Sequence, residues 1–286
     1  NRRKLVICIV KTIIISAIAI LFVMPLIWMG LSALKTTNEV FAHPFKWLPA
    51  KPMWSNFKQV WCVENVNMMK SYGNSIIIVF FSTVGQIAIA SLAAYAFARL
   101  RFVGRKYGLM SLLVLQVFPN SMAVAGYYIL IYKFGLVDSS IALIFVLAGG
   151  SAYNIWLLKS YIDGLPVELD EAAMVDGANE FQVFYKIIIP LAMPQLAVIF
   201  LFSFIATYSE YVITSIFLQT PGKMTLALGL QSFISDQFAA HWTLFSAAAV
   251  ISSLPPEKQA DVARRIAQMD RTSPDVIKQV EKVLEK

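Results

Sequence analysis

Side chains capable of acid–base, nucleophilic or metal chemistry are sparse in this sequence and do not form groups. The two histidines, His43 and His241, lie far apart with no other metal-ligating residue types near them. The two cysteines, Cys8 and Cys62, show neither C-x-x-C spacing nor the paired framework of a disulfide-rich protein. No Ser–His–Asp arrangement is evident either. We therefore predict that the chain has no catalytic residue and no metal site.

Nucleotide chemistry is also unexpected. A phosphate-binding loop of the G-x-x-x-x-G-K-[ST] type does not occur in the sequence. The nearest candidate, Gly149-Gly150-Ser151, lies in an apolar stretch and lacks the following Lys-Ser/Thr pair. We predict that the chain is not an enzyme and binds no cofactor. If ATP powers its activity, ATP and Mg²⁺ are held by a partner.

Composition places the chain in the membrane class. Apolar residues make up 58%, charged residues only 14%, and the mean hydropathy is +0.66, whereas soluble domains carry about 25% charged residues. The net charge of +7 could indicate nucleic-acid binding. Basic residues here flank apolar stretches, as the loops of membrane proteins do. We therefore expect the chain to lie in membrane lipid and not to bind nucleic acid.

The apolar stretches predict an all-α fold, a polytopic transmembrane bundle of about six spans with a short soluble helical tail. A first span occupies residues 1–34, an external loop 35–70, a membrane core 71–254 and the tail 255–286. A span needs about 20 apolar residues, so the final stretch from Trp242 to Leu254 predicts a shortened sixth span. The core spans are expected at 72–98, 107–132, 141–158 and 191–217.

Three local features refine this layout. Trp47, Trp54, Phe57 and Trp61 indicate a short amphipathic segment in the external loop, or an ordinary loop packed on the bundle. Small residues in the second span, such as Gly85 and Ala90, are typical of closely packed membrane helices. Pro119-Asn120 interrupts the third span, which favours either a helix break lining a cavity or a packing distortion.

Charge in the loops predicts the orientation. Arg99, Arg101, Arg105 and Lys106 occupy one short loop without an acidic residue, which is the signature of the cytoplasmic side. The N-terminus and segment 159–190 are then also cytoplasmic. Segments 35–70, 133–140 and 218–240 are external.

Segment 159–190 is a polar interruption with helix-forming patterns. Acidic residues follow Pro166 and favour a helix start, and Gly177 suits a helix end. Asn179 and Gln182 then predict the cap of a second helix, over 180–189, that Pro190 closes. An exposed helix–glycine–helix unit of this kind is typical of docking into a groove on another protein.

This segment resembles the EAA loop of binding-protein-dependent ABC transporter permeases. Glu171-Ala172-Ala173, Gly177, Ile187 and Pro190 match at the family spacing, while Ile189 replaces the usual Leu. The stretches 115–119 and 225–230 look like the carbohydrate-uptake, MalG-like subfamily. The residues that the resemblance assigns to ATPase coupling are Glu171, Ala172, Ala173, Asp176, Gly177, Ile187 and Pro190.

The resemblance implies a permease subunit of a sugar importer whose substrate is of the maltose or oligosaccharide type. It implies a multi-pass protein of the bacterial inner membrane. The implied partners are a second permease subunit, two cytoplasmic ATPase subunits and an extracytoplasmic solute-binding protein. Substrate would move by alternating access driven by the ATPase.

The tail has a different character. Residues 255–286 contain seven Lys/Arg and six Asp/Glu, and the stretch from Leu254 onward resembles the flagellar motor switch protein FliG. Pro255 and Ser273-Pro274 predict the starts of two soluble helices. The two resemblances meet near Ser252–Leu254, which indicates a joined or misassembled sequence, an engineered fusion or a natural rearrangement. The sixth span is then incomplete, and whether the chain supports transport is open.

Polar residues within the spans are candidates for the substrate path: Gln86, Asn120, Asn154, Tyr208, Glu210 and Tyr211. Glu210 is the sharpest candidate because an ionisable group inside a span is usually functional. A hydrogen-bonded structural acid is the alternative for Glu210. Two other functions stay open at this point: an ion-coupled secondary transporter, and a membrane anchor for the tail.

Overall fold

The protein is described here by a computed structural model that covers residues 2–44, 46–62, 68–117, 120–149, 152–235, 241–255 and 258–259. Within these ranges the regular secondary structure is helical and contains no strand, which confirms the all-α prediction. The chain forms two compact units. One comprises residues 1–69 and 229–286, and the other comprises residues 70–228.

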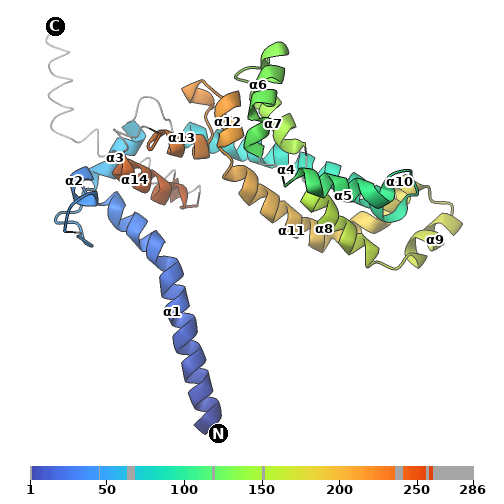
Figure 1. Ribbon diagram of the computed structural model, residues 1–286, viewed down its shortest axis with the longest axis horizontal. Coiled ribbons are helices and arrows are strands. Elements are labelled where there is room, and N and C mark those ends of the chain that lie inside the picture. Colours follow the sequence, from blue (N-terminus) through green and yellow to red (C-terminus); the bar gives the residue numbers. More distant parts are fainter. Residues whose placement is uncertain are drawn as a thin grey trace. The chain divides into compact units, whose positions relative to one another are not determined.

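The first unit is built around the membrane helix α1 (Arg2–Ala33). It also contains α2 (Thr37–Val40), α3 (Ser55–Cys62) and α14 (Trp242–Ser252). Helices α1 and α3 both pack against α14 (Figure 1). Helix α3 lies where the sequence predicts an amphipathic segment, and the rings of Trp54 and Phe57 are in contact there. The predicted helices of the tail lie outside the described residues.

Lys35 organises the junction after α1. Its side chain is fully buried, and its Nζ donates to the carbonyl of Lys46 at 2.6 Å and lies over the Trp28 ring. Burial lowers the pKa of Lys35, and the nearby Glu39 carboxylate partly opposes that shift. The Asn56 amide donates to the carbonyls of Ala33 and Lys35, which satisfies acceptors that the end of α1 leaves unpaired.

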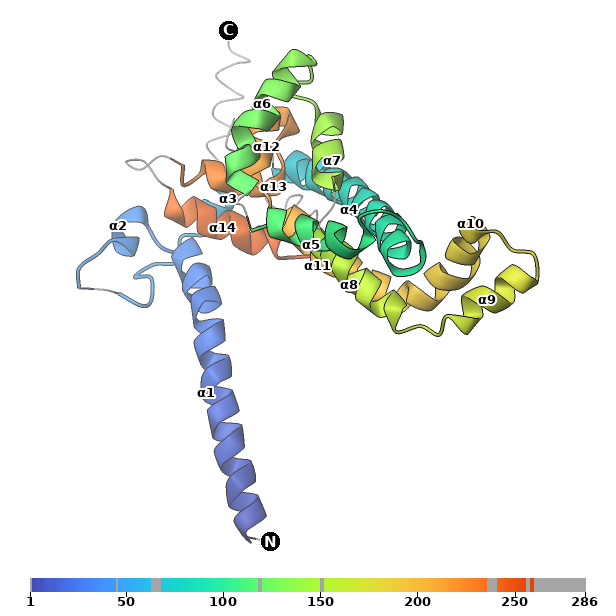
Figure 2. The same ribbon diagram turned by 45° about the vertical axis from the view of Figure 1, so that its right-hand side comes forward.

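The second unit carries the candidate site. In Figures 1 and 2, helices α4, α5, α8 and α11 run beside one another. The elements are α4 (Met68–Arg99), α5 (Arg105–Leu115), η1 (Asn120–Ala123), α6 (Val124–Lys133), α7 (Ser140–Ala148), α8 (Ala152–Asp163), α9 (Glu168–Val175), α10 (Glu180–Val183), η2 (Phe184–Ile188), α11 (Ile189–Tyr208), α12 (Val212–Phe217), η3 (Pro221–Lys223) and α13 (Leu226–Ser232). The first two residues of α4 and the last residues of α13 belong to the first unit.

Three helices in the described residues are long and apolar enough to cross a membrane: Val6–Ala33, Met68–Arg99 and Glu180–Tyr208. The pair α7 and α8 makes a fourth if a bend of 46° is allowed. This pair lies where the sequence predicts a span over 141–158, and α7 ends at Ala148, next to Gly149. The break in the third predicted span separates α5 from η1, although Pro119 itself lies outside the described residues.

The prediction that Pro190 ends a helix is wrong. A continuous helical segment runs from Glu180 to Tyr208, with a π-helical turn at Phe184–Ile188. The N–H of Ile189 bonds to the carbonyl of Phe184, five residues back. This wider turn accommodates Pro190, which lacks an N–H and would clash with the carbonyl four residues earlier in an α-helix.

The fifth span also ends earlier than predicted. Helix α11 stops at Tyr208, and a separate helix, α12, begins at Val212. The predicted span over 191–217 is therefore two helices joined by residues 209–211. Glu210 lies in this junction, so its surroundings are those of a helix end and not of a continuous span.

Small residues allow the helices of this unit to approach closely, as the sequence predicts. Ala90, Ala94 and Ala98 are buried in a core with residues of α8 and α11. A Cβ added at Gly85 would lie only 2.7 Å from the Cβ of Ala148. Real carbon atoms do not approach so closely, so glycine is needed where α4 meets α7.

Candidate coupling site

Helix α9 begins and ends with the signals that the sequence predicts. Glu168, Asp170 and Glu171 occupy its first turn, where carboxylates interact favourably with the positive end of the helix dipole. Gly177 has φ +86°. The N–H of Gly177 donates to the Met174 carbonyl, and the N–H of Ala178 donates to the Ala173 carbonyl. These two bonds form a Schellman motif, which confirms Gly177 as the end of the helix.

The second predicted cap is also present. The N–H of Gln182 donates to Asn179 Oδ1 and the N–H of Asn179 donates to Gln182 Oε1, both at 2.9 Å. This reciprocal pair is the capping box that the sequence predicts for the start of α10. Local hydrogen bonds therefore cap both ends of the turn at 176–179.

An ion pair holds α9 against the end of α4. Arg99 is the last residue of α4, and its Nε contacts Asp170 Oδ2. The two side chains are only 10% and 5% exposed, and Arg99 Nη2 also donates to the Leu165 carbonyl at 3.0 Å. The second oxygen, Asp170 Oδ1, is buried without a hydrogen-bond partner among the described residues. Asp170 therefore depends on Arg99 for its stabilisation.

A second polar contact anchors α10. The Tyr95 hydroxyl on α4 donates to Glu180 Oε2 at 3.0 Å, and the Tyr95 ring packs against Phe184. Neither this contact nor the Arg99–Asp170 pair is among the predicted site residues. Charges of opposite sign in two segments expected on the same side of the membrane are the signal that could have paired Arg99 with an acid.

The outer side of α9 is open. Asp170 and Ala173 face the bundle, whereas Glu171, Ala172, Asp176 and Gly177 are exposed. Val175 at the tip is 87% exposed. The structure therefore places four of the predicted coupling residues on one free surface, which we call the tip of α9.

Two other predicted coupling residues lie away from this tip. Ile187 is half-buried in the π-helical turn, and Pro190 is exposed in the first turn of α11. Both belong to the long helix that follows. Their place favours a role in carrying the loop into the membrane helix, since the π-turn joins α10 directly to α11.

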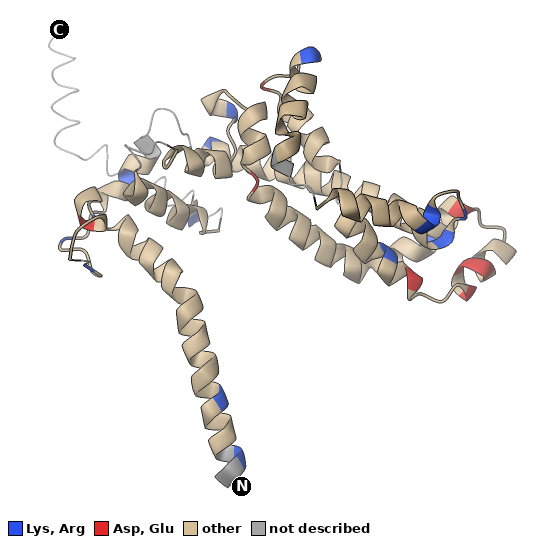
Figure 3. Cartoon of the chain, in the orientation of Figure 1, with Lys and Arg blue, Asp and Glu red and all other residues tan. Residues whose placement is uncertain are grey.

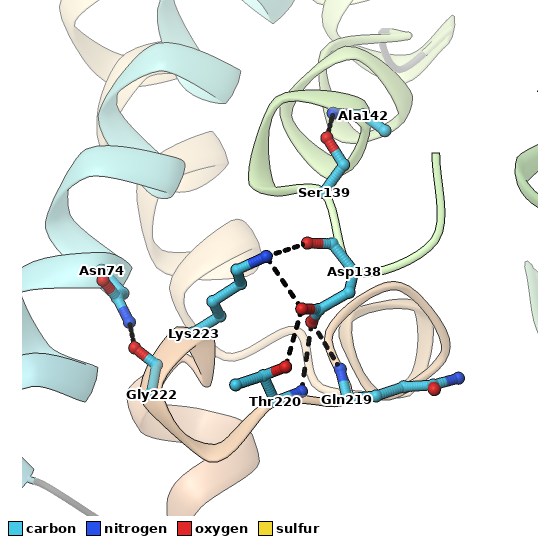
Figure 4. Close-up of polar contacts among 8 residues, drawn as sticks. All are labelled: Asn74, Asp138, Ser139, Ala142, Gln219, Thr220, Gly222 and Lys223. Atoms are coloured by element: carbon cyan, nitrogen blue, oxygen red, sulfur yellow. Dashed lines mark hydrogen bonds and ion pairs between the residues drawn. The ribbon is translucent and has the colours of Figure 1, made fainter. Parts of the chain in front are cut away.

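At the other end of the unit, the segments predicted to be external also contact each other. Figure 4 shows Asp138 accepting hydrogen bonds from the N–H groups of Gln219 and Thr220 and from the Thr220 hydroxyl. Lys223 Nζ lies 2.8 Å from Asp138 Oδ2. Burial opposes ionisation of Asp138, but these donors outweigh it and hold its pKa well below the usual value.

The two sets of contacts agree with the predicted alternation of loops. Segment 99–106 contacts segment 159–190 through Arg99, and segment 133–140 contacts segment 218–223 through Asp138. Figure 3 shows acidic and basic residues together at the end of the unit that carries α9 and α10, while the helices between are largely uncharged. Loops predicted on one side of the membrane thus meet at one end of the unit.

Two of the predicted substrate-path residues, Gln86 and Asn154, donate hydrogen bonds to the last turns of α11. Asn154 Nδ2 donates to Ser203 Oγ at 2.8 Å. Gln86 Nε2 donates to Thr207 Oγ1 at 3.2 Å and to the Leu147 carbonyl. Ser203 and Thr207 are four residues apart and share one helix face. Both predicted amides therefore tie neighbouring helices to α11.

Three further candidates lie at the α11–α12 junction. The Tyr208 ring stacks on Phe204, and Tyr211 is 40% exposed. Glu210 accepts hydrogen bonds from the N–H groups of Ile213 and Thr214 and from the Thr214 hydroxyl. These bonds cap α12 and favour the structural reading of Glu210. The side chain of Asn120 lies outside the described residues.

Models of two protein families match the chain. A family model described as "Binding-protein-dependent transport system inner membrane component" matches residues 6–255. A model for the FliG middle domain matches residues 240–286. Both resemblances seen in the sequence are therefore confirmed.

The similar proteins are sugar-transport permeases. The chain is 32% identical to the galactooligosaccharides transport system permease protein GanQ of Bacillus subtilis, covering 85% of this chain and 86% of that protein. It is 34% identical to the maltodextrin permease MdxG of the same organism, over 84% of this chain and 86% of that protein. It is 37% identical to MalG of Escherichia coli over 64% of this chain and 63% of that protein.

A solved structure shares the fold. A chain of a bacterial ABC transporter involved in the import of alginate superposes with a TM-score of 0.72 at 24% identity, covering 93% of this chain and 98% of that one. The family model spans nearly the whole membrane part and the bacterial permeases match along most of their length. This chain belongs to the family of binding-protein-dependent transport system inner membrane components.

Proposed function

We propose that the chain is the permease subunit of an importer that carries an oligosaccharide of the maltodextrin or galactooligosaccharide type. The support is its similarity to permeases named for these substrates. The proposed substrate path consists of the polar residues near the end of α11. Tyr208 and Tyr211 provide aromatic rings there, and the chain passes from α11 to α12 at residues 209–211. Substrate crosses by alternating access.

The tip of α9 is the proposed docking site for the ATPase. One observation carries this assignment: Asp170 on one side of α9 is buried against Arg99, while Val175 at the tip is 87% exposed. A short helix held firmly on one side and free on the other can transmit a push from a partner to α4. Through the π-turn, the same push reaches α11.

The proposed assembly contains a second permease subunit, two cytoplasmic ATPase subunits that hold ATP and Mg²⁺, and an extracytoplasmic solute-binding protein. The chain lies in the bacterial inner membrane with its N-terminus in the cytoplasm. The clustering of Arg99, Arg101, Arg105 and Lys106 supports this orientation, because basic residues accumulate in cytoplasmic loops.

The test is co-purification with the ATPase and ATP-dependent uptake of labelled maltodextrin by reconstituted vesicles. Gly177→Ala places a side chain at φ +86° and should distort the tip of α9. Gly135→Ala is the matched control, because Gly135 has φ +66° in the loop at the other end of the unit. We expect the Gly177 variant to lose ATPase binding and uptake, and the Gly135 variant to keep both.

Two outcomes would contradict the proposal. If the Gly177 variant binds the ATPase as well as the Gly135 variant and the wild type do, the tip of α9 is not the docking site. Uptake that proceeds without any ATPase and follows an ion gradient would instead favour a secondary transporter.

A further inference from the structure

A basic cavity lies at the end of the second unit near α9. Its volume is about 670 Å³, and its walls come from the end of α4, the turn at 102–104, α5 and α8. We propose that this cavity binds an anionic phospholipid, with the phosphate at its basic rim and an acyl chain along its apolar wall. The inference goes beyond the proposed function and needs only the membrane location of the family.

The charge of the cavity selects an anion. Arg105, Lys106 and Lys159 line it, and no acidic residue does. Arg105 is partly committed, because its guanidinium donates to the carbonyls of Phe97 and Ala98 at the end of α4. Lys159 pairs with Asp163, one turn away on α8.

Lys106 is the principal ligand in this proposal. It is exposed and makes no ion pair within the described part of the chain. Its Nζ lies 5.4 Å from the centre of the Tyr107 ring, so an aromatic face and an ammonium group adjoin at the rim. A cation and an aromatic ring side by side are typical of membrane surfaces.

The remaining wall selects an amphiphile over a small anion. Phe97 and Phe102 pack edge to face at 5.3 Å between ring centres, and Met110 and Trp156 add apolar surface. Met110 is 64% exposed and Trp156 is 42% exposed. An apolar wall next to basic residues matches an acyl chain attached to a phosphate, because basic pockets between membrane helices bind anionic head groups.

The turn that lines the cavity has a backbone that favours glycine. Gly104 lines it and has φ +94°, a conformation that side chains rarely adopt. A Cβ added at Gly108 would meet the Phe97 ring at 3.1 Å, so α5 lies close to α4 at this point. The turn therefore directs Lys106 to the rim while α5 stays packed on the bundle.

Binding can be measured on the full purified chain in nanodiscs by quenching of Trp156 with brominated lipids. Brominated phosphatidylglycerol is titrated into phosphatidylcholine, and a Trp156→Phe variant identifies the signal from the other tryptophans. We expect preference for phosphatidylglycerol in the wild type. Lys106→Gln should weaken it about fivefold, since one basic residue near an anionic surface contributes on that order.

Two variants make the comparison specific. Lys106→Arg should keep the preference, and Lys133→Gln removes an equal charge from the end of α6, outside the cavity. Thermal unfolding of each variant shows whether it is folded. The proposal fails if Lys106→Gln and Lys133→Gln change the preference equally.

Two added components distinguish other occupants. If inorganic phosphate reverses the quenching in the wild type but not in Lys106→Gln, the site binds a free anion and the lipid assignment is wrong. If the preference vanishes when the second permease subunit is bound, protein covers the cavity and the assignment is also wrong. Preference that persists under both conditions supports the lipid site.

Discussion

Loss of the Arg99–Asp170 ion pair should release α9 from α4. Arg99→Met keeps much of the side chain's apolar length and removes its charge. Asp170 would then be a buried carboxylate without its cation, and its other oxygen already has no hydrogen-bond partner among the described residues. Removing one partner of a buried ion pair costs about 3–5 kcal/mol. Solvent screens the interaction between these two charges little, because the side chains are only 10% and 5% exposed.

Hydrogen–deuterium exchange of the peptide covering residues 168–178 measures this release. A tenfold change in an equilibrium corresponds to about 1.4 kcal/mol, so exchange should accelerate by roughly two to three and a half orders of magnitude, up to the limit set by global unfolding. The double variant Arg99→Met/Asp170→Leu should recover much of the protection, because replacing both ions with apolar residues is often neutral.

The exposed pair Lys159–Asp163 provides the control. Its side chains are 25% and 43% exposed, and exposed pairs four residues apart in a helix contribute only about 0.3–0.5 kcal/mol. Lys159→Met should therefore change exchange about twofold at most. Equal effects of Arg99→Met and Lys159→Met on residues 168–178 would refute the claim that the buried pair holds α9.

Three further outcomes are expected. Gly85→Val should destabilise the protein in detergent unfolding by about 1–3 kcal/mol because of its contact with Ala148, whereas Gly73→Ala, with nothing within 4 Å, should change it little. Asn179→Ala should lose the capping box and about 1 kcal/mol, measured by the same unfolding. The stabilisation from Asp138 should be fully present above its unfolded-state pKa near 3.9 and disappear only as the pH falls through its lowered folded-state pKa; the Asp138→Asn variant should lack this acid-dependent step.

The sequence alone determined the class of protein and the layout of α9 and α10. Composition places the chain in the membrane class, and the caps at Gly177 and Asn179 depend on residues within a few positions of each other. Such caps can be predicted from the sequence, because their hydrogen bonds join near neighbours in the chain. The EAA spacing likewise identified the family.

Only the tertiary structure decided which polar residues meet. Arg99 and Asp170 are 71 residues apart in the sequence, and no local pattern pairs them. The continuity of the helix through Pro190 was missed because proline predicts a break, while the π-turn that removes its clash forms in a long packed helix. Glu210 looked like an ion inside a span until the end of α11 at Tyr208 placed it at the cap of α12. Burial and helix ends arise from packing between distant segments. The sequence pattern could therefore identify polar residues as candidates, but it could not predict their contacts.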